Sequence, residues 1–127
     1  MDILMTHAYY LFDDPIERQV MKPYPPLGLL YIAAYLRSLG YQVEVVDSTF
    51  MTPGDHLAAI AQSKASVVGI YANMITRRNV SRIIATVKQR GATVVMGGPD
   101  PVNYTKEYFD IGADVIGAAL AKNKNSC

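Results

Sequence analysis

The chain has 127 residues, of which 50% are hydrophobic and 18% charged, and its formal net charge is +1. This length suits one compact domain, and the near balance of charge argues against a nucleic acid or an anionic membrane as partner. The apolar runs fall far short of the roughly 20 residues that span a bilayer, and no secretory signal pattern opens the chain. We therefore expect a cytoplasmic globular domain.

The single cysteine, Cys127, excludes a disulfide within the chain. With only two histidines beside it, the chain also lacks the ligands of a structural zinc site. These residues therefore cannot supply the thiolates for any chemistry that needs several of them.

Short β-branched runs alternate with longer helical patterns. The apolar runs predict strands at residues 3–6, 43–46, 67–71, 93–96 and 114–116. Helical spacing predicts helices at residues 27–39, 53–63, 78–90 and 106–111. Strands that are apolar on both faces are typical of a parallel sheet with helices on both sides.

This order predicts an α/β fold, a flavodoxin-like (Rossmann-like) three-layer sandwich with a five-stranded parallel sheet of order 2-1-3-4-5. The strand order of a dinucleotide-binding half remains the alternative. We expect the domain to occupy residues 1–117. Residues 118–127 show no strand or core pattern, so a frayed tail or a truncated linker is expected there.

In such a sheet, ligands bind beyond the carboxyl ends of the strands, where the strand order switches. The loops at residues 8–26, 72–77 and 97–104 meet at that edge. The first is long and aromatic, with Tyr9, Tyr10 and Tyr24, and either covers a ligand or forms a surface flap. Gly97 and Gly98 end the fourth strand with bare backbone, which suits either a ligand or a tight turn.

Several familiar motifs are absent. No G-x-G-x-x-G follows the first strand and no P-loop is present, so Asp47 is not expected to hold the ribose of a nicotinamide cofactor. Arg77 and Arg78 could meet a phosphate, although a solvated helix start is the simpler interpretation. His7 and His56 lie too far apart in the pattern to be expected in one constellation.

Residues 25–36, Pro-Pro-Leu-Gly-Leu-Leu-Tyr-Ile-Ala-Ala-Tyr-Leu, resemble a signature of the N-terminal cobalamin-binding domains of radical S-adenosylmethionine enzymes. The resemblance continues through residues 40–47, 68–70, 84–88, 95–99 and 112–115. It covers residues 1 to about 117, and its specificity comes from the ordered set rather than from any single piece. The family includes the anaerobic magnesium-protoporphyrin IX monomethyl ester cyclase type and methyltransferases.

The resemblance implies a cobalamin at the carboxyl edge of the sheet, with its nucleotide tail near Gly97 and Gly98. The resemblance, together with the expected ligand site at the sheet edge, suggests a set of cofactor-binding residues. They are Tyr9, Tyr10, Pro26, Leu27, Gly28, Tyr71, Ala72, Asn73, Met74, Gly97, Gly98 and Pro99. No catalytic residue and no metal ligand is assigned to this chain.

Two departures from the family pattern matter. The D-x-H-x-x-G motif, whose histidine ligates cobalt, is missing, as it is in many radical enzymes of this type, so cobalamin without histidine ligation is expected. Ala72 stands where the wider family has the serine of S-x-L, which removes a hydroxyl contact to the nucleotide base.

A radical enzyme of this family holds an iron–sulfur cluster through C-x-x-x-C-x-x-C, and one cysteine cannot do so. The resemblance therefore implies a binding module, with the cluster, S-adenosylmethionine and a C-terminal radical barrel outside these residues. Two alternatives remain. One is a cofactor-free docking domain that uses Tyr9, Tyr10 and Tyr24, and the other is a small nucleotide- or sugar-binding enzyme.

Overall fold

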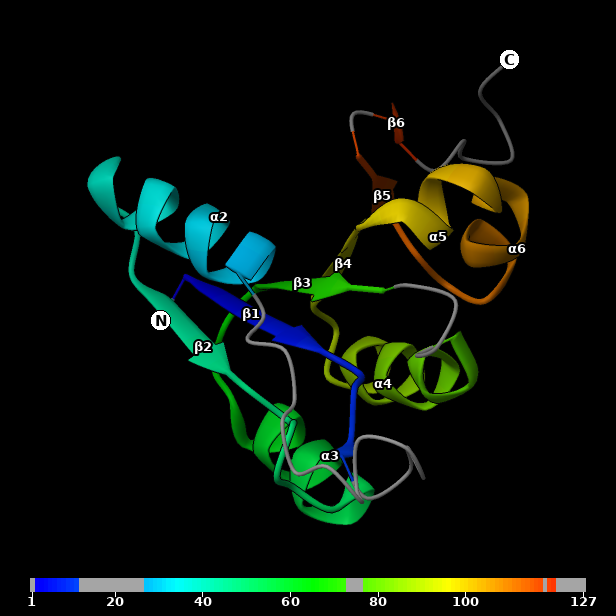
Figure 1. Ribbon diagram of the computed structural model, residues 1–127, viewed down its shortest axis with the longest axis horizontal. Coiled ribbons are helices and arrows are strands. Elements are labelled where there is room, and N and C mark those ends of the chain that lie inside the picture. Colours follow the sequence, from blue (N-terminus) through cyan, green and yellow to red (C-terminus); the bar gives the residue numbers. More distant parts are fainter. Residues whose placement is uncertain (1, 12–26, 73–76, 118, 121–127) are drawn as a thin grey trace.

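The computed structural model describes residues 2–11, 27–72, 77–117 and 119–120, without the side chains of residues 27, 77–78 and 119–120 (Figure 1). In chain order the elements are β1 (Ile3–His7), α2 (Leu27–Ser38), β2 (Val43–Val46), α3 (Pro53–Gln62), β3 (Val67–Tyr71), α4 (Arg77–Gln89), β4 (Thr93–Gly97), α5 (Pro99–Asn103), α6 (Thr105–Asp110), β5 (Val115–Ile116) and β6 (Ala119–Leu120).

The described strands form one sheet of order β2-β1-β3-β4-β5-β6. The first five are parallel, so the predicted order 2-1-3-4-5 is confirmed, and the order of a dinucleotide-binding half is not found. No strand is expected from the sequence after residue 117. In the structure Ala119–Leu120 nevertheless forms β6, which pairs antiparallel with β5. A two-residue strand leaves no period in the sequence from which it could be recognised.

The helix termini follow local sequence signals. Thr52 caps α3 by accepting a hydrogen bond from the backbone N–H of Asp55 at 3.1 Å, and Pro53 opens the helix. Gly40 and Gly91 follow the ends of α2 and α4 with positive φ, which glycine adopts at little cost. The predicted helices therefore agree with the observed ones to within a residue or two.

The segment between β4 and α6 differs from its prediction as a loop, because residues 99–103 form α5. Gly98 precedes the helix with φ +99°, and Pro99 and Asp100 then begin a single short turn of helix. Five residues are too few for a helical period to show in the sequence.

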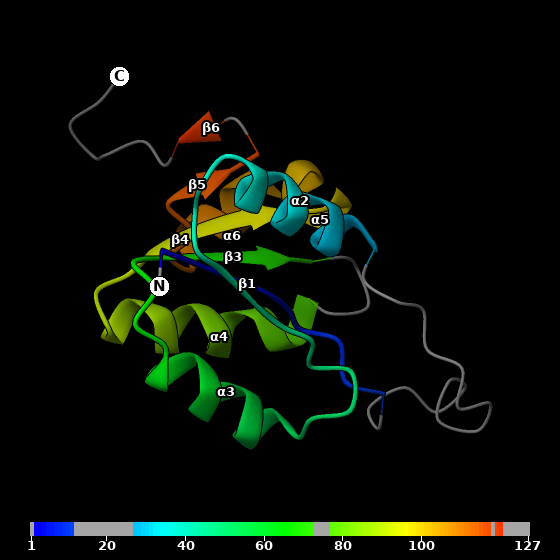
Figure 2. The same ribbon diagram turned by 90° about the vertical axis from the view of Figure 1, so that its left-hand side faces the viewer.

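The two faces of the sheet are covered unequally. On one face, side chains of α3, α4 and α6 join the main core, which includes Leu4, Ile60, Ile83 and Tyr108. On the other face, α2 packs Leu29 and Ala33 against Met5 and Val43 in a smaller cluster. Figure 2 shows α2 on one side of the sheet and α3 and α4 on the other. None of the described helices is both long and apolar enough to cross a membrane.

Candidate functional site

The carboxyl ends of the three central strands lie side by side. His7 ends β1 opposite Tyr71 of β3, and Tyr71 lies opposite Gly97 of β4. The strand order changes direction between β1 and β3, which is where open parallel sheets bind their ligands.

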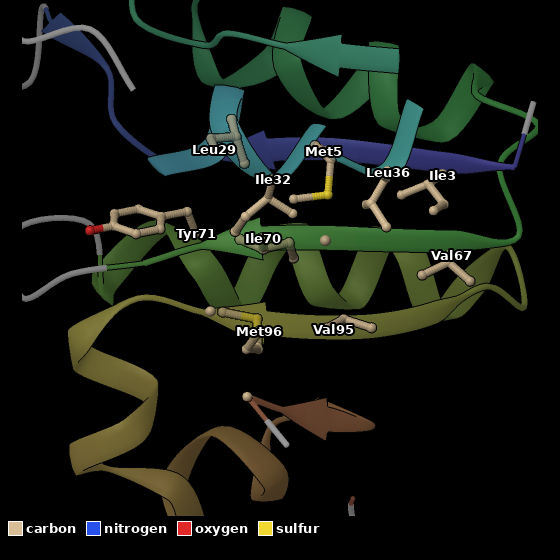
Figure 3. A pocket seen from close by; sticks show the side chains of 13 residues that line it. Ile3, Met5, Leu29, Ile32, Leu36, Val67, Ile70, Tyr71, Val95 and Met96 are labelled. Carbon is tan, nitrogen blue, oxygen red and sulfur yellow. The ribbon is translucent and has the colours of Figure 1, made fainter. Parts of the chain in front are cut away.

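A cavity of about 300 Å³ lies on the face of the sheet that α2 covers, between α2 and strands β1, β3 and β4 (Figure 3). Met5, Leu29, Ile32 and Leu36 line it from β1 and α2, and none of its described lining residues is charged. Tyr71 lies at the end of the cavity nearest the carboxyl ends of the strands, with its hydroxyl pointing away from Met5 and Ile32. The cavity therefore suits an apolar group that enters from the edge of the sheet.

Glycines make much of the cavity floor. Gly69 and Gly97 both line it, and a Cβ added at Gly97 would meet nothing within 4 Å. At Gly69 a Cβ would lie 2.6 Å from Sδ of Met5, so the missing side chain lets Met5 lie across β3. Bare backbone at Gly97 therefore leaves the space above β4 open, whereas the space above Gly69 is filled by Met5.

The ring of Tyr71 lies between two glycines that the sequence places far apart. A Cβ on Gly28 would lie 3.7 Å from Cε2 of Tyr71, and one on Gly98 would lie 3.2 Å from the same atom. The start of α2, the end of β3 and the end of β4 therefore meet at Tyr71. Three of the residues predicted to bind the cofactor are brought together here.

Gly98 is also held close to backbone. Its φ of +99° lies in a region that L side chains rarely adopt, and a Cβ there would fall 2.3 Å from the carbonyl oxygen of Ala72. The N–H of Ala72 donates to the carbonyl of Gly97 at 2.9 Å. Ala72 is fully buried, so this close approach of β3 and β4 leaves no exposed side chain at residue 72.

The other predicted site residues are placed as follows. Pro99 is exposed and opens α5, and Leu27 opens α2. Pro26, Asn73 and Met74 lie outside the described residues, as does Tyr24.

Tyr10 lies apart from the cavity. Its side chain is 3% exposed, and its hydroxyl is 2.6 Å from Nδ1 of His56 on α3, on the opposite side of the sheet from α2. Tyr9 is half-buried, and its carbonyl accepts a hydrogen bond from Ser48 Oγ at 2.7 Å. The aromatic segment after β1 therefore turns toward the α3 layer, because His56 offers Tyr10 a buried hydrogen-bond partner there.

His7 belongs to a polar cluster that the sequence did not reveal. Its Nε2 lies 2.7 Å from Oδ1 of Asp47, and Asp47 also accepts hydrogen bonds from the N–H and hydroxyl of Thr49. Burial raises the pKa of Asp47, but the hydrogen bonds from Thr49 and His7 and the charge of His7 outweigh it, so the pKa lies below its ordinary value. Asp47 therefore stays ionised and orients the His7 ring.

His56 is the second buried histidine, and it is fully enclosed. Its Nε2 lies 2.7 Å from Oγ1 of Thr6, the residue directly before His7. Both histidines are thus attached to the end of β1, but through consecutive residues on opposite faces of the sheet, so the expectation that they form no single constellation stays a prediction. Burial, followed by the charge of His7, lowers the pKa of His56 to about 4, so the ring is neutral at neutral pH.

Among the described residues, no group of three or more His, Cys, Asp or Glu side chains could hold a metal ion. The hydroxyl of Ser48 donates to the carbonyls of His7 and Tyr9, so it fixes backbone.

Comparison with known proteins agrees with this geometry. The family model for the B12 binding domain matches residues 17–123. Among curated proteins, none matches the chain. Because the family model covers most of the chain, this protein belongs to the B12-binding family and is a cobalamin-binding domain.

Proposed function

We propose that this chain holds cobalamin at the carboxyl edge of its sheet as the binding module of a radical S-adenosylmethionine enzyme. The enzyme is an oxidative cyclase of the magnesium-protoporphyrin IX monomethyl ester type or a methyltransferase. The observation that carries the placement is the apolar, glycine-floored cavity that ends at Tyr71 and Gly97.

The residues present fit the nucleotide tail of this cofactor. Its benzimidazole base is flat and apolar, and the cavity offers about 300 Å³ lined by apolar side chains and bare backbone. This volume stands at the lower end of the roughly 300–1,000 Å³ typical of ligand pockets, so it suits the tail and not the whole corrin. Gly97 leaves open space at the cavity, since a Cβ added there would meet nothing within 4 Å, and a larger side chain such as valine would project into it.

The residues of this chain would bind the nucleotide tail of cobalamin and orient it. Met5, Ile32 and Leu36 would enclose the apolar base and exclude water from it. Tyr71, fixed between Gly28 and Gly98, would form the mouth of the cavity. Bound cobalamin would supply the cobalt-centred group-transfer chemistry, which these residues do not themselves perform.

We further propose that the cobalt takes no histidine ligand from this chain. Both histidines already have partners, His7 with Asp47 and Ser48 and His56 with Thr6 and Tyr10. Moving the His56 ring would break its buried hydrogen bonds with Thr6 and Tyr10, at a cost of about 1–3 kcal/mol, and moving the His7 ring would break its contact with the exposed Asp47.

The radical step would use groups outside these residues. An iron–sulfur cluster needs several thiolate ligands, and Cys127 is the only cysteine here. A C-terminal radical barrel carrying the cluster and S-adenosylmethionine is therefore the partner we propose. Translating the gene beyond residue 127 tests this, since a C-x-x-x-C-x-x-C stretch is expected and its absence would contradict the radical assignment.

Cobalamin binding is tested by mixing the purified chain with hydroxocobalamin and following the corrin absorbance through gel filtration. We expect retention by the wild type and about tenfold weaker binding by Gly97→Val, because the new side chain occupies the cavity. Gly54→Val is the matched control, since Gly54 also faces open space but lies on α3, in the other layer.

Two results would contradict the proposal. If the folded wild type retains no cobalamin, the module does not bind the cofactor alone. If Gly97→Val and Gly54→Val bind equally well, the tail does not use the cavity.

Ligation is tested by electron paramagnetic resonance of the bound cob(II)alamin. Without a nitrogen ligand from the protein, we expect no histidine-derived nitrogen splitting of the cobalt signal, and the same spectrum for His7→Phe and the wild type. A nitrogen splitting that disappears in His7→Phe would overturn the proposal of ligation-free binding.

A further inference from the structure

His7 is almost completely enclosed, yet only one of its two ring nitrogens has a partner. Its side chain is 7% exposed, and Nε2 lies 2.7 Å from Oδ1 of Asp47 and 3.2 Å from the backbone nitrogen of Ser48. Nδ1 has no hydrogen-bond partner among the described residues, where the side-chain nitrogens that are both enclosed and unpartnered belong to Arg90. The small exposed part of the His7 ring therefore includes Nδ1.

His56 shows how a histidine that only supports the fold is placed in this protein. It is fully buried, and both of its ring nitrogens have partners, Nδ1 with Tyr10 and Nε2 with Thr6. Polar groups inside a protein normally find their partners within it. The His7 ring leaves one nitrogen to water instead, and a group of a ligand can replace such a water.

Asp47 decides which nitrogen of His7 carries the proton. Its carboxylate is ionised at neutral pH and accepts hydrogen bonds from the N–H and the hydroxyl of Thr49. A carboxylate oxygen at 2.7 Å requires a hydrogen atom on Nε2, so the longer contact with Ser48 is not a hydrogen bond to Nε2 in this tautomer. In the neutral ring Nδ1 is therefore a hydrogen-bond acceptor.

His7 lies on the face of the sheet that lines the cavity. Side chains alternate along a strand, and Ile3 and Met5 of β1 both line the cavity, so His7 is the next side chain on that face toward the carboxyl edge. Its register partner on β3 is Tyr71, which lies at the end of the cavity. His7 is thus the first polar side chain of β1 beyond the apolar lining.

We propose that Nδ1 of His7 accepts a hydrogen bond from a ribose hydroxyl of the cobalamin tail, and that Asp47 is a positioning residue that holds the ring in the required tautomer. This inference rests on the proposed function, in which the benzimidazole base occupies the cavity. The ribose is attached directly to that base, so it is the first polar part of the tail outside the apolar lining. Ligand sites commonly combine an apolar lining with a few polar groups that fix the orientation of the ligand.

The tautomer is tested in the full chain without cofactor, labelled with ¹⁵N in its two histidines. Long-range ¹H–¹⁵N spectra at neutral pH distinguish a protonated ring nitrogen from an unprotonated one, and His56→Gln assigns the signals of His7. We expect Nδ1 of His7 to be unprotonated, and Asp47→Asn to move part of the population to the other tautomer. A proton on Nδ1 in the wild type, or identical spectra for the wild type and Asp47→Asn, would overturn the proposal.

The contact with the ribose is tested by adding hydroxocobalamin, or cobinamide, which has the corrin but lacks the nucleotide tail. Hydroxocobalamin is expected to move the Nδ1 resonance of His7 while this nitrogen stays unprotonated, and cobinamide is expected to leave the resonance in place. His7→Phe should bind hydroxocobalamin about tenfold more weakly than the wild type, because one hydrogen bond is lost, and should bind cobinamide equally well. His56→Gln, on the other face, is the control and should bind both as the wild type does.

The outcomes separate this proposal from the proposed function. An unchanged Nδ1 resonance in a chain that retains hydroxocobalamin contradicts the contact. Protonation of Nδ1 on binding indicates the phosphate as its partner, and an equal shift with cobinamide indicates the corrin or the cobalt, so either result also overturns the proposal. If the folded wild type retains no hydroxocobalamin in gel filtration, the proposed function itself fails, and this proposal fails with it.

Discussion

At the scale of single residues, His56 organises the end of β1 from the opposite face. The Tyr10 hydroxyl can donate to Nδ1 of His56, whose Nε2–H then donates to Thr6 Oγ1. The Thr6 hydroxyl in turn donates to the carbonyl of Val46 at 2.8 Å. Every member of this buried chain is satisfied when His56 is neutral and protonated on Nε2. Such networks stabilise one arrangement of the elements that they connect.

This network makes stability depend on pH. The pKa of His56 is lowered from 6.5 to about 4, so the unfolded chain takes up a proton before the folded one does. The free energy of unfolding should therefore fall as the pH drops from about 6.5 to about 4, by up to roughly 3 kcal/mol. Urea titrations at intervals between pH 7 and pH 4 would measure it.

His56→Gln is the control, because a glutamine can keep one donor and one acceptor but does not titrate. This variant should lose most of the slope above pH 4. Asp47 adds to this slope only below about pH 3.8. Its pKa in the folded chain is lowered from 3.8, so the stability that it gives is lost only as the pH falls further. An equal slope in both proteins would show that other groups cause the acid sensitivity.

Sequence patterns predict positions that follow from the topology of the sheet, but not side-chain contacts that depend on how distant elements pack. The position of Gly97, Gly98 and Tyr71 at one edge of the sheet was predictable, because strand ends in a parallel sheet share one edge. That they bind a cofactor stays a prediction. The contact between His56 and Thr6 joins residues 50 apart in the chain. It depends on how α3 packs and on which side Tyr10 turns, neither of which a local pattern records. The same applies to Asp47 beside His7, 40 residues away.

At the scale of elements, the junction between β4 and α5 brings Gly98 close to the backbone of Ala72. Gly98→Ala should lower the free energy of unfolding by about 1–3 kcal/mol, because the residue has φ +99° and its Cβ would meet Ala72. Gly97→Ala is the matched variant, with open space around the added methyl, and should change stability little. Urea denaturation compares the two, and equal losses would refute the argument from φ.

The elements themselves were predictable where they were long and bounded. Pro25-Pro26 and Gly40 delimit α2, and the run of apolar residues at helical spacing identifies α4. The short elements were not predictable, because the five residues of α5 and the two of β6 are too few to show a period in the sequence. Their existence depends on Gly98 and on the pairing with β5, which are tertiary features.

At the scale of the whole molecule, ligand binding should stabilise the fold as a unit. A cofactor that binds the folded chain alone raises the free energy of unfolding by about 2.7 kcal/mol at 100 times its dissociation constant. Melting with increasing hydroxocobalamin should therefore show a rising midpoint, and Gly97→Val should require more cofactor for the same shift. A midpoint that ignores hydroxocobalamin would contradict specific binding to the native state.

The fold class was predictable because each strand is short, apolar and followed by a helix, which leaves a parallel sheet as the simplest solution. The unequal covering of the two faces was not predictable from that pattern. It follows from where α3, α4 and α6 pack, with α2 alone opposite them.

One consequence of β1 concerns communication between the layers. Thr6 and His7 are consecutive, so their side chains point to opposite faces, one to His56 and the other to Asp47. A small displacement of this strand end must therefore change hydrogen-bond lengths on both sides at once. A substitution within α3 that moves Thr6 would in this way also act on the contact between His7 and Asp47, through a path only one peptide bond long.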